Sequence, residues 1–176
     1  MTARAWDWTE LLAARDVFVK SLGQEHKFGC LLCVLPDPVR KEISDWVIEN
    51  IDDCHLAPEG RELRPHVTVS YGFDEETTSV LSRLRPLLAR TGPIAARLTG
   101  LSLFKGGPDG DVLHCTVDSP GLVELHEAIA GAFSLPGNKY PEYRTHVTLA
   151  YLRPDASSLY AEEHPPFLGQ VVKLTE

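Results

Sequence analysis

No apolar run in this sequence approaches the roughly 18 residues that span a bilayer. The opening stretch, MTARAWDWTELL, has no continuous apolar segment and carries Asp7 and Glu10, so it does not read as a secretion signal. Low-complexity segments and flexible linkers are also missing, and 176 residues suit one domain with a sizeable core. We therefore expect a single globular domain in the cytoplasm, with no membrane partner.

Cysteine is scarce, with four residues in the chain, which excludes a disulfide-dense scaffold. Cys30 and Cys33 lie in the apolar run FGCLLCVL, and on a strand positions i and i+3 face opposite sides. These two thiols are therefore poorly placed to share a metal. We expect reduced cysteines and neither a metal nor another cofactor.

Basic residues are fewer than acidic ones, with 17 Lys+Arg against 25 Asp+Glu and a net charge of -8. A protein that coats duplex nucleic acid needs the opposite balance, because it binds by neutralising phosphates. Long duplexes are therefore not expected as partners. A small anion or a short nucleotide remains possible, since local basic residues can override a global negative charge.

Periodicity divides the chain into alternating helices and strands. Helical spacing of apolar residues predicts helices at 8–21, 39–51, 74–90 and 120–133, with Asp37 and Ser119 before prolines as start signals and Pro86 expected to kink or split the third. Apolar or alternating runs predict strands at 28–35, 66–71, 94–104, 111–117, 145–151 and 167–174. Residues 52–65 and 134–144 are expected to be loops.

A repeat stands out within this pattern. Residues 66–71 read HVTVSY and residues 146–151 read HVTLAY, 80 residues further on. Each segment follows a strand, a capped helix and a loop, so the repeated unit is larger than six residues. Two copies with this period indicate two related lobes around a shared groove rather than a solenoid.

Side chains alternate along a strand, so the histidine and threonine of each motif share one face. His66 and Thr68 form one such pair, and His146 and Thr148 form the other. Burying them without partners would cost about 1–3 kcal/mol each, so this face should be open to solvent. The alternate residues should pack on helices: Val67, Val69, Tyr71, Val147, Leu149 and Tyr151.

Two histidines and two hydroxyls suit phosphate chemistry better than metal binding or a nucleophilic triad. Threonine is a weak metal ligand and neither motif carries a carboxylate. Threonine hydroxyls can donate hydrogen bonds to non-bridging oxygens of a phosphate. One neutral histidine can take a proton from a nucleophile while a protonated one gives a proton to the leaving oxygen. The pattern thus favours in-line displacement at phosphorus.

Paired His-x-Thr motifs in this element order resemble the two-histidine (2H) phosphoesterase superfamily, over about residues 27–176. That group includes the LigT-like RNA 2′,3′-cyclic phosphodiesterases, historically called 2′-5′ RNA ligases. The resemblance implies an α+β fold with two pseudo-symmetric lobes, each an antiparallel sheet with flanking helices, around a central cleft. It makes His66 and His146 the catalytic pair and Thr68 and Thr148 the phosphate ligands. It also makes His66 the acid and His146 the base, although nothing in the sequence itself orders them.

Two features depart from the plain LigT pattern: a helical extension over residues 1–26, and the loop NKYPEYR before the second motif. Tyrosines and a cation in that loop could stack on a base. The expected substrate-binding residues are Tyr140, Tyr143, Arg144, Lys105 and Arg64.

We expect the substrate to be a nucleotide phosphodiester, either a 2′,3′-cyclic phosphate or a short or cyclic oligonucleotide, and the protein to be a monomer. Alternatives are a hydrolase of cyclic di- or trinucleotide signals and a non-catalytic nucleotide-binding module. A metal-dependent hydrolase is a third alternative. The remaining histidines show no ligand-like spacing and are interpreted as structural or exposed: His26, His55, His114, His126 and His164.

Overall fold

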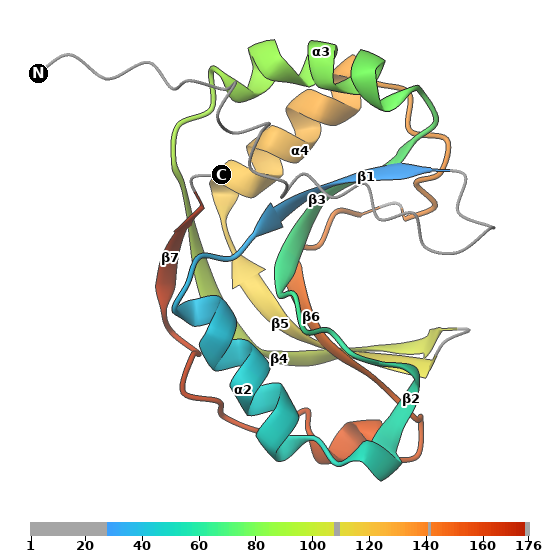
Figure 1. The fold of residues 1–176 in the computed structure, drawn as a ribbon, viewed down its shortest axis with the longest axis vertical. Helices are drawn as coiled ribbons and strands as arrows, with labels where there is room; N and C mark the ends of the chain where they lie inside the picture. The colour runs from blue at the N-terminus through green and yellow to red at the C-terminus, as the bar shows by residue number, and fades with distance from the viewer. Residues whose placement is uncertain (1–27, 108–109, 141, 175–176) are drawn as a thin grey trace, which may run out of the picture.

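The computed structural model describes residues 28–107, 110–140 and 142–174 (Figure 1). The predicted extension at residues 1–26, including the helix at 8–21, lies outside these residues. Two short 3₁₀ turns are η1 (Asp53–His55) and η2 (Ser157–Leu159). The helices and strands of the described part are, in chain order, β1 (Gly29–Val34), α2 (Val39–Asn50), β2 (Leu56–Arg61), β3 (His66–Phe73), α3 (Thr77–Leu88), β4 (Ile94–Gly107), β5 (Gly110–Asp118), α4 (Pro120–Ala132), β6 (His146–Leu152) and β7 (Val171–Leu174).

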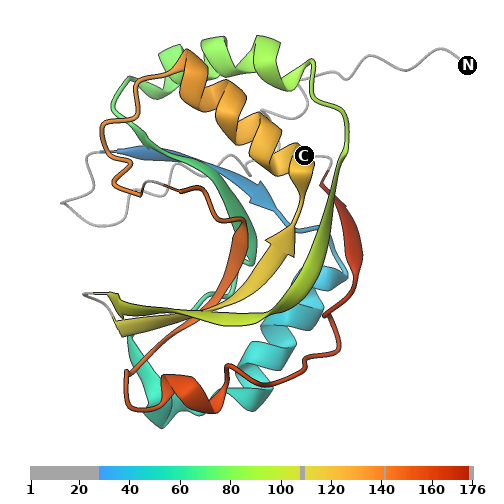
Figure 2. The ribbon, with the colours of Figure 1, turned by 180° about the vertical axis from the view of Figure 1, so that it is seen from behind.

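The strands form one antiparallel sheet in the order β1-β3-β6-β5-β4-β7, with β2 pairing to β6 beside this path. The sheet curls, and the helices lie outside the curve (Figures 1 and 2). Helix α4 packs on β3 and β4, and α2 packs on β6. The predicted mixture of helices and antiparallel strands is confirmed, and the inner face of the curl carries no helix of the described residues.

The two lobes meet where β3 lies against β6. Val67 pairs with Val147 at this junction, and both side chains are completely buried. The junction joins the sheets of the two lobes into one. On either side, β1 flanks β3 and β5 flanks β6, so each motif strand is hydrogen-bonded to the strand that opens its own repeat.

Apolar residues at helical spacing explain how the helices cover the sheet. In α4, Leu122, Leu125 and Ile129 are buried, as their spacing predicted. The Ser119 hydroxyl accepts a hydrogen bond from the Leu122 N–H at 3.3 Å, so the predicted cap of this helix is confirmed.

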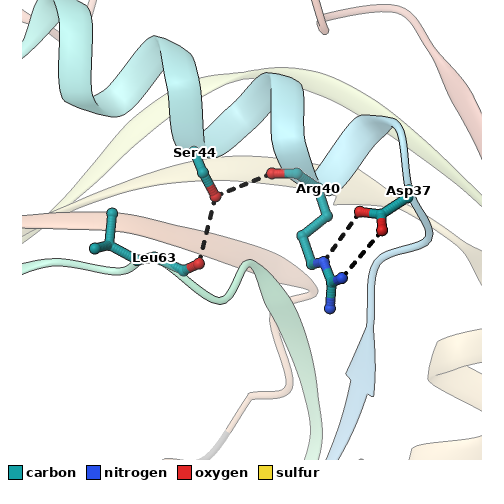
Figure 3. A network of polar contacts seen from close by, with 4 residues as sticks. All are labelled: Asp37, Arg40, Ser44 and Leu63. Carbon is teal, nitrogen blue, oxygen red and sulfur yellow. Dashed lines mark hydrogen bonds and ion pairs between the residues drawn. The ribbon is translucent and has the colours of Figure 1, made fainter.

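Helix α2 starts differently from the prediction. Asp37 does not cap the helix; its carboxylate accepts from the Arg40 guanidinium, with Nε–Oδ1 at 3.2 Å and Nη2–Oδ2 at 3.1 Å (Figure 3). One turn on, the Ser44 hydroxyl lies 3.0 Å from the Arg40 carbonyl oxygen and 3.4 Å from that of Leu63 (Figure 3). Ser44 therefore connects α2 to the segment that leads into β3 and its histidine.

The prediction of a loop over residues 52–65 is wrong in part, because this stretch contains β2. Pro58 and Gly60 disfavour a regular strand, but β2 pairs on one side only and its register shifts between Leu56 and Arg61. An irregular edge strand tolerates both residues, since few of its N–H groups must join a ladder.

Two further boundaries differ from the predictions. Helix α3 continues through Pro86 to Leu88 as one helix and is not split there; the proline lies in its last turn. Strand β7 begins at Val171 rather than at residue 167. Phe167 is instead completely buried, with its ring edge-to-face to Trp46 at 5.8 Å between centroids.

Candidate active site

The two His-x-Thr motifs lie on the helix-free face of the sheet. Val67 and Val147 pair across the β3–β6 junction and point into the core, so the residues on either side of them point the other way. His66, Thr68, His146 and Thr148 are each half-buried. The pairing of Val67 with Val147 is antiparallel, so one residue further along in each direction a histidine of one motif is opposite the threonine of the other. His66 is thus opposite Thr148, and Thr68 is opposite His146. The repeat therefore places two histidines and two hydroxyls on one patch of the inner face.

A β-bulge follows each motif at the same position. The β1–β3 register skips Val69, and the β5–β6 register skips Leu149, again 80 residues apart. A bulge reverses the alternation that follows it, so Ser70 and Ala150 are buried in the core. The prediction that Tyr71 and Tyr151 join the core face is wrong for this reason, and both tyrosines are half-buried. The sequence pattern alone does not reveal an extra residue of this kind.

Both histidines are oriented by the same contact. Nδ1 of His66 lies 2.7 Å from the carbonyl oxygen of Arg64, and Nδ1 of His146 lies 2.7 Å from that of Arg144. A carbonyl oxygen can only accept, so Nδ1 of each ring carries the proton. Nε2 is therefore the nitrogen that takes up or releases a proton at each motif.

The electrostatic environment favours the neutral form of His146. Burial lowers the pKa of His146, the hydrogen bond to the Arg144 carbonyl opposes this shift, and the positive charge of His66 lowers the pKa further. The interaction between the two charges requires the imidazoles to lie near one another. The arrangement can hold one neutral and one protonated imidazole beside two hydroxyls, which is the combination that acid–base chemistry at a phosphate requires.

A third histidine, missed by the sequence analysis, lies beside the second motif. His114 was interpreted as structural or exposed; it is 3% exposed on β5 and stands opposite Thr148 in the sheet. Its ring stacks on Phe104 at 3.9 Å between centroids. Alternation in the strand around it, with Leu113 and Cys115 in the core, was a signal that His114 faces the same side as the motifs.

Tyr143, expected to bind substrate, is half-buried and contacts β3 and α4. Its hydroxyl donates to the Thr68 carbonyl at 3.0 Å, and its ring stacks on His126 at 3.9 Å and 8°. Burial raises the pKa of Tyr143, and the charge of Cys33 adds to the effect. His126 in turn donates from Nδ1 to the Val69 carbonyl at 2.7 Å. These two rings satisfy carbonyls of β3 at its bulge, where β6 no longer pairs with it.

The other expected substrate-binding residues are exposed. Tyr140 is 78% exposed, and the Arg144 guanidinium pairs with Glu142 at 2.8 Å. Arg64 and Lys105 are also exposed, the first just before β3 and the second on the β4–β5 hairpin. The charge of Arg144 lowers the pKa of His114, which places this guanidinium near the second motif.

Metal binding has no candidate cluster in the part of the chain that the structure describes. No group of three or more His, Cys, Asp or Glu side chains there is arranged to hold an ion. The four cysteines are free thiols. Within the same residues, no helix has the length and apolar character needed to cross a bilayer.

The fold is shared with a protein of known structure. The chain is similar to TT0787 of Thermus thermophilus, with a TM-score of 0.52 and 21% identity over 82% of this chain and 80% of that one. At this identity the similarity concerns the fold alone. Comparison with curated proteins finds no match.

The family follows from the sequence match. Residues 35–169 match the 2'-5' RNA ligase superfamily, which is well over half of the chain. The protein belongs to the 2'-5' RNA ligase superfamily, and the resemblance recognised from the two motifs is confirmed. Membership implies an enzyme of phosphoesterase or ligase type.

Proposed function

We propose that the protein is a metal-independent phosphodiesterase that hydrolyses a nucleotide phosphodiester, either a 2′,3′-cyclic phosphate or a short or cyclic oligonucleotide. His66 and His146 act as the acid–base pair, and Thr68 and Thr148 bind the phosphate. The observation that carries this proposal is the matched orientation of the two imidazoles. Each Nδ1 donates to the carbonyl two residues upstream at 2.7 Å, which leaves each Nε2 for proton transfer.

His146 acts as the general base in this scheme, because burial and the charge of His66 favour its neutral form. Its Nε2 takes a proton from water as the water oxygen attacks phosphorus. Protonated His66 gives its Nε2 proton to the leaving oxygen as the P–O bond breaks. Water is thus added across one P–O bond, and proton exchange with solvent restores the starting states of both rings.

The threonine hydroxyls donate hydrogen bonds to the non-bridging oxygens, whose negative charge grows in the transition state. Such preorganised donors act most strongly where charge develops during the reaction. Their placement on the same face as the imidazoles supports this role. If the same pair activated an alcohol in place of water, attack on a cyclic phosphate would join two nucleotides, so joining and hydrolysis are distinguished by their products.

A short nucleotide agrees with the charges near the motifs. The chain carries a net charge of -8, so long duplexes are disfavoured, while Arg144, Arg64 and Lys105 offer local positive charge. Tyr140 is exposed enough to stack on a base. Tyr143 stays a predicted substrate-binding residue, although its hydroxyl and ring already contact Thr68 and His126.

The test is a product analysis with purified protein in the presence and absence of a strong chelator. The substrates are 2′,3′-cyclic mononucleotides, cyclic dinucleotides and 2′-5′-linked oligoadenylate, with products identified by mass and chromatography. We expect hydrolysis of at least one substrate that survives the chelator and is lost in His66→Ala and His146→Ala. His164→Ala, an exposed histidine outside the motifs, is the matched control and should retain full activity.

Nucleotide binding without turnover by the wild-type protein would overturn the proposal in favour of a binding module. Activity abolished by the chelator and restored by a divalent ion would overturn it in favour of a metal-dependent enzyme. Formation of a phosphodiester without hydrolysis would instead identify a ligase.

A further inference from the structure

Three aromatic rings from neighbouring strands contact one another at the second motif. Phe104 on β4 stacks on His114 of β5, with 3.9 Å between ring centroids and 14° between planes. His146 on β6 stands edge-to-face to both, at 4.9 Å and 85° from Phe104 and at 5.3 Å and 71° from His114. His146 therefore stands beside the stacked pair of Phe104 and His114, at a steep angle to both rings, and we call this arrangement of three rings the ring corner.

His114 is built into this corner as a neutral ring. Its Nδ1 lies 3.3 Å from the Val112 carbonyl oxygen, so that nitrogen carries the proton. Burial lowers the pKa of His114 to about 4, the contact with Val112 opposes this, and the charges of His146 and Arg144 lower it further. At neutral pH the ring therefore acts on its neighbour by packing and by excluding water, not by charge.

The first motif has no such corner. His114 stands opposite Thr148 in the β5–β6 ladder, and the residue opposite Thr68 in the β1–β3 ladder is Leu32. No aromatic contact of His66 is found among the described residues. The two imidazoles therefore share one backbone contact but have different side-chain surroundings.

We propose that His114, together with Phe104, is a positioning residue for His146: the two rings fix the plane of the His146 imidazole and keep water away from it, so that it remains neutral. The catalytic consequence rests on the function proposed above, in which His146 is the base. The effect on the His146 ring itself is independent of any reaction.

Other charges near His146 must be separated from this effect. His66 faces it from β3, and Arg144, paired with Glu142, precedes it in the loop before β6. From β5 the titratable neighbour is His114, and from β4 the neighbour is Phe104, which does not titrate. Substitutions of Phe104 and His114 leave these charged groups in place. A change in the titration midpoint of His146 in such variants is therefore caused by the loss of the two rings.

The experiment follows the His146 imidazole by NMR in histidine-labelled protein, with its signal assigned as the one lost in His146→Gln. We expect a midpoint below the ordinary histidine value of about 6.5 in wild-type protein. His114→Phe keeps a stacked ring and should leave the midpoint low. His114→Ala admits water and should raise it. Phe104→Leu removes the other ring and should raise it as well, which gives a second reading if His114→Ala does not fold.

Equal midpoints in wild type, His114→Ala and Phe104→Leu would overturn the proposal. The proposal would also be overturned if the His146 midpoint rose as far in His114→Phe as in His114→Ala. In that case the nitrogens of the His114 imidazole, and not the presence of a packed ring, would keep the midpoint low.

For any substrate that the protein turns over, the rate should fall at low pH as His146 is protonated. In His114→Ala and Phe104→Leu, this fall should occur at a higher pH, in step with the raised NMR midpoint. Loss of the fixed geometry in His114→Ala should also lower kcat by up to about 100-fold. A wild-type protein without phosphodiesterase activity but with the expected midpoints would refute the proposed function and leave the positioning role intact.

Discussion

The two halves of the molecule carry the same motif on the same kind of strand, but they support it differently. After the second motif, the Leu149 carbonyl accepts a hydrogen bond from the backbone N–H of Glu62 at 2.9 Å. After the first motif, the Val69 carbonyl accepts from the imidazole of His126 at 2.7 Å. Backbone from the other repeat satisfies one bulge, and side chains satisfy the other.

The neighbours of the histidines differ in the same way. His146 is in contact with Phe104 and His114, and its half of the sheet includes β4 and β5, whereas His66 lies beside the shorter, aliphatic β1. The two halves share the imidazole, the hydroxyl, the bulge and the Nδ1 contact. In the second half, burial and the charge of His66 lower the pKa of His146.

The largest expected effect comes from removing either imidazole. His66→Ala and His146→Ala should each lower turnover by about 10²–10⁴-fold, the usual range for a positioned acid or base. The double variant should lose less than the product of the two losses, because the pair acts as a unit. Single-turnover rates of the four proteins measure this, and fully multiplicative losses would show that the halves work independently.

A smaller loss is expected from the hydroxyls. Thr68→Val and Thr148→Val keep the shape and remove one hydrogen bond to phosphate, so each should weaken transition-state binding by roughly 2–4 kcal/mol. The comparison of kcat/KM for the two variants tests the symmetry of phosphate binding directly. A loss confined to one threonine would mean that a single half holds the phosphate.

Acid stability should depend on the second half more than on the first. The pKa of His114 is about 4 in the folded protein against 6.5 as its ordinary value, so the unfolded chain binds more protons between these limits. Stability must then fall as the pH is lowered through this range, by about 2 kcal/mol between pH 7 and pH 5 from this residue. Urea unfolding at both values should show this loss in the wild type and a smaller loss in His114→Phe. An equal loss in both proteins would contradict the neutral, buried state of His114.

The smallest expected effect concerns the side-chain support of the first half. Tyr143→Phe removes the hydroxyl that donates to the Thr68 carbonyl at 3.0 Å, so the free energy of unfolding should fall by about 1 kcal/mol. Tyr140→Phe removes the same group from a side chain that is 78% exposed, and it should be neutral. Urea unfolding of the two variants measures the difference. Equal stabilities would show that this carbonyl finds another partner without cost.

Local chemistry made several elements predictable from the sequence. Ser119 before Pro120, followed by apolar residues at helical spacing, predicted α4 and its cap, which need nothing beyond their own segment. The β4–β5 hairpin and both motif strands were predicted for the same reason. Strand β2 was missed because Pro58 and Gly60 mark a loop locally, and only its partner β6 makes that stretch a strand.

The candidate site likewise has features that the local sequence determined and features that only tertiary contacts decided. The repeated His-x-Thr spacing by itself determined that each histidine shares a face with its threonine, because alternation along a strand is a local property of the backbone. Tertiary structure alone decided that Val67 meets Val147, which places the two motifs on one patch, and that His114 stands beside His146. It also brought the hydroxyl of Tyr143 to the carbonyl oxygen of Thr68. These outcomes depend on contacts between residues 32 to 80 positions apart in the chain, whose energies no local pattern encodes.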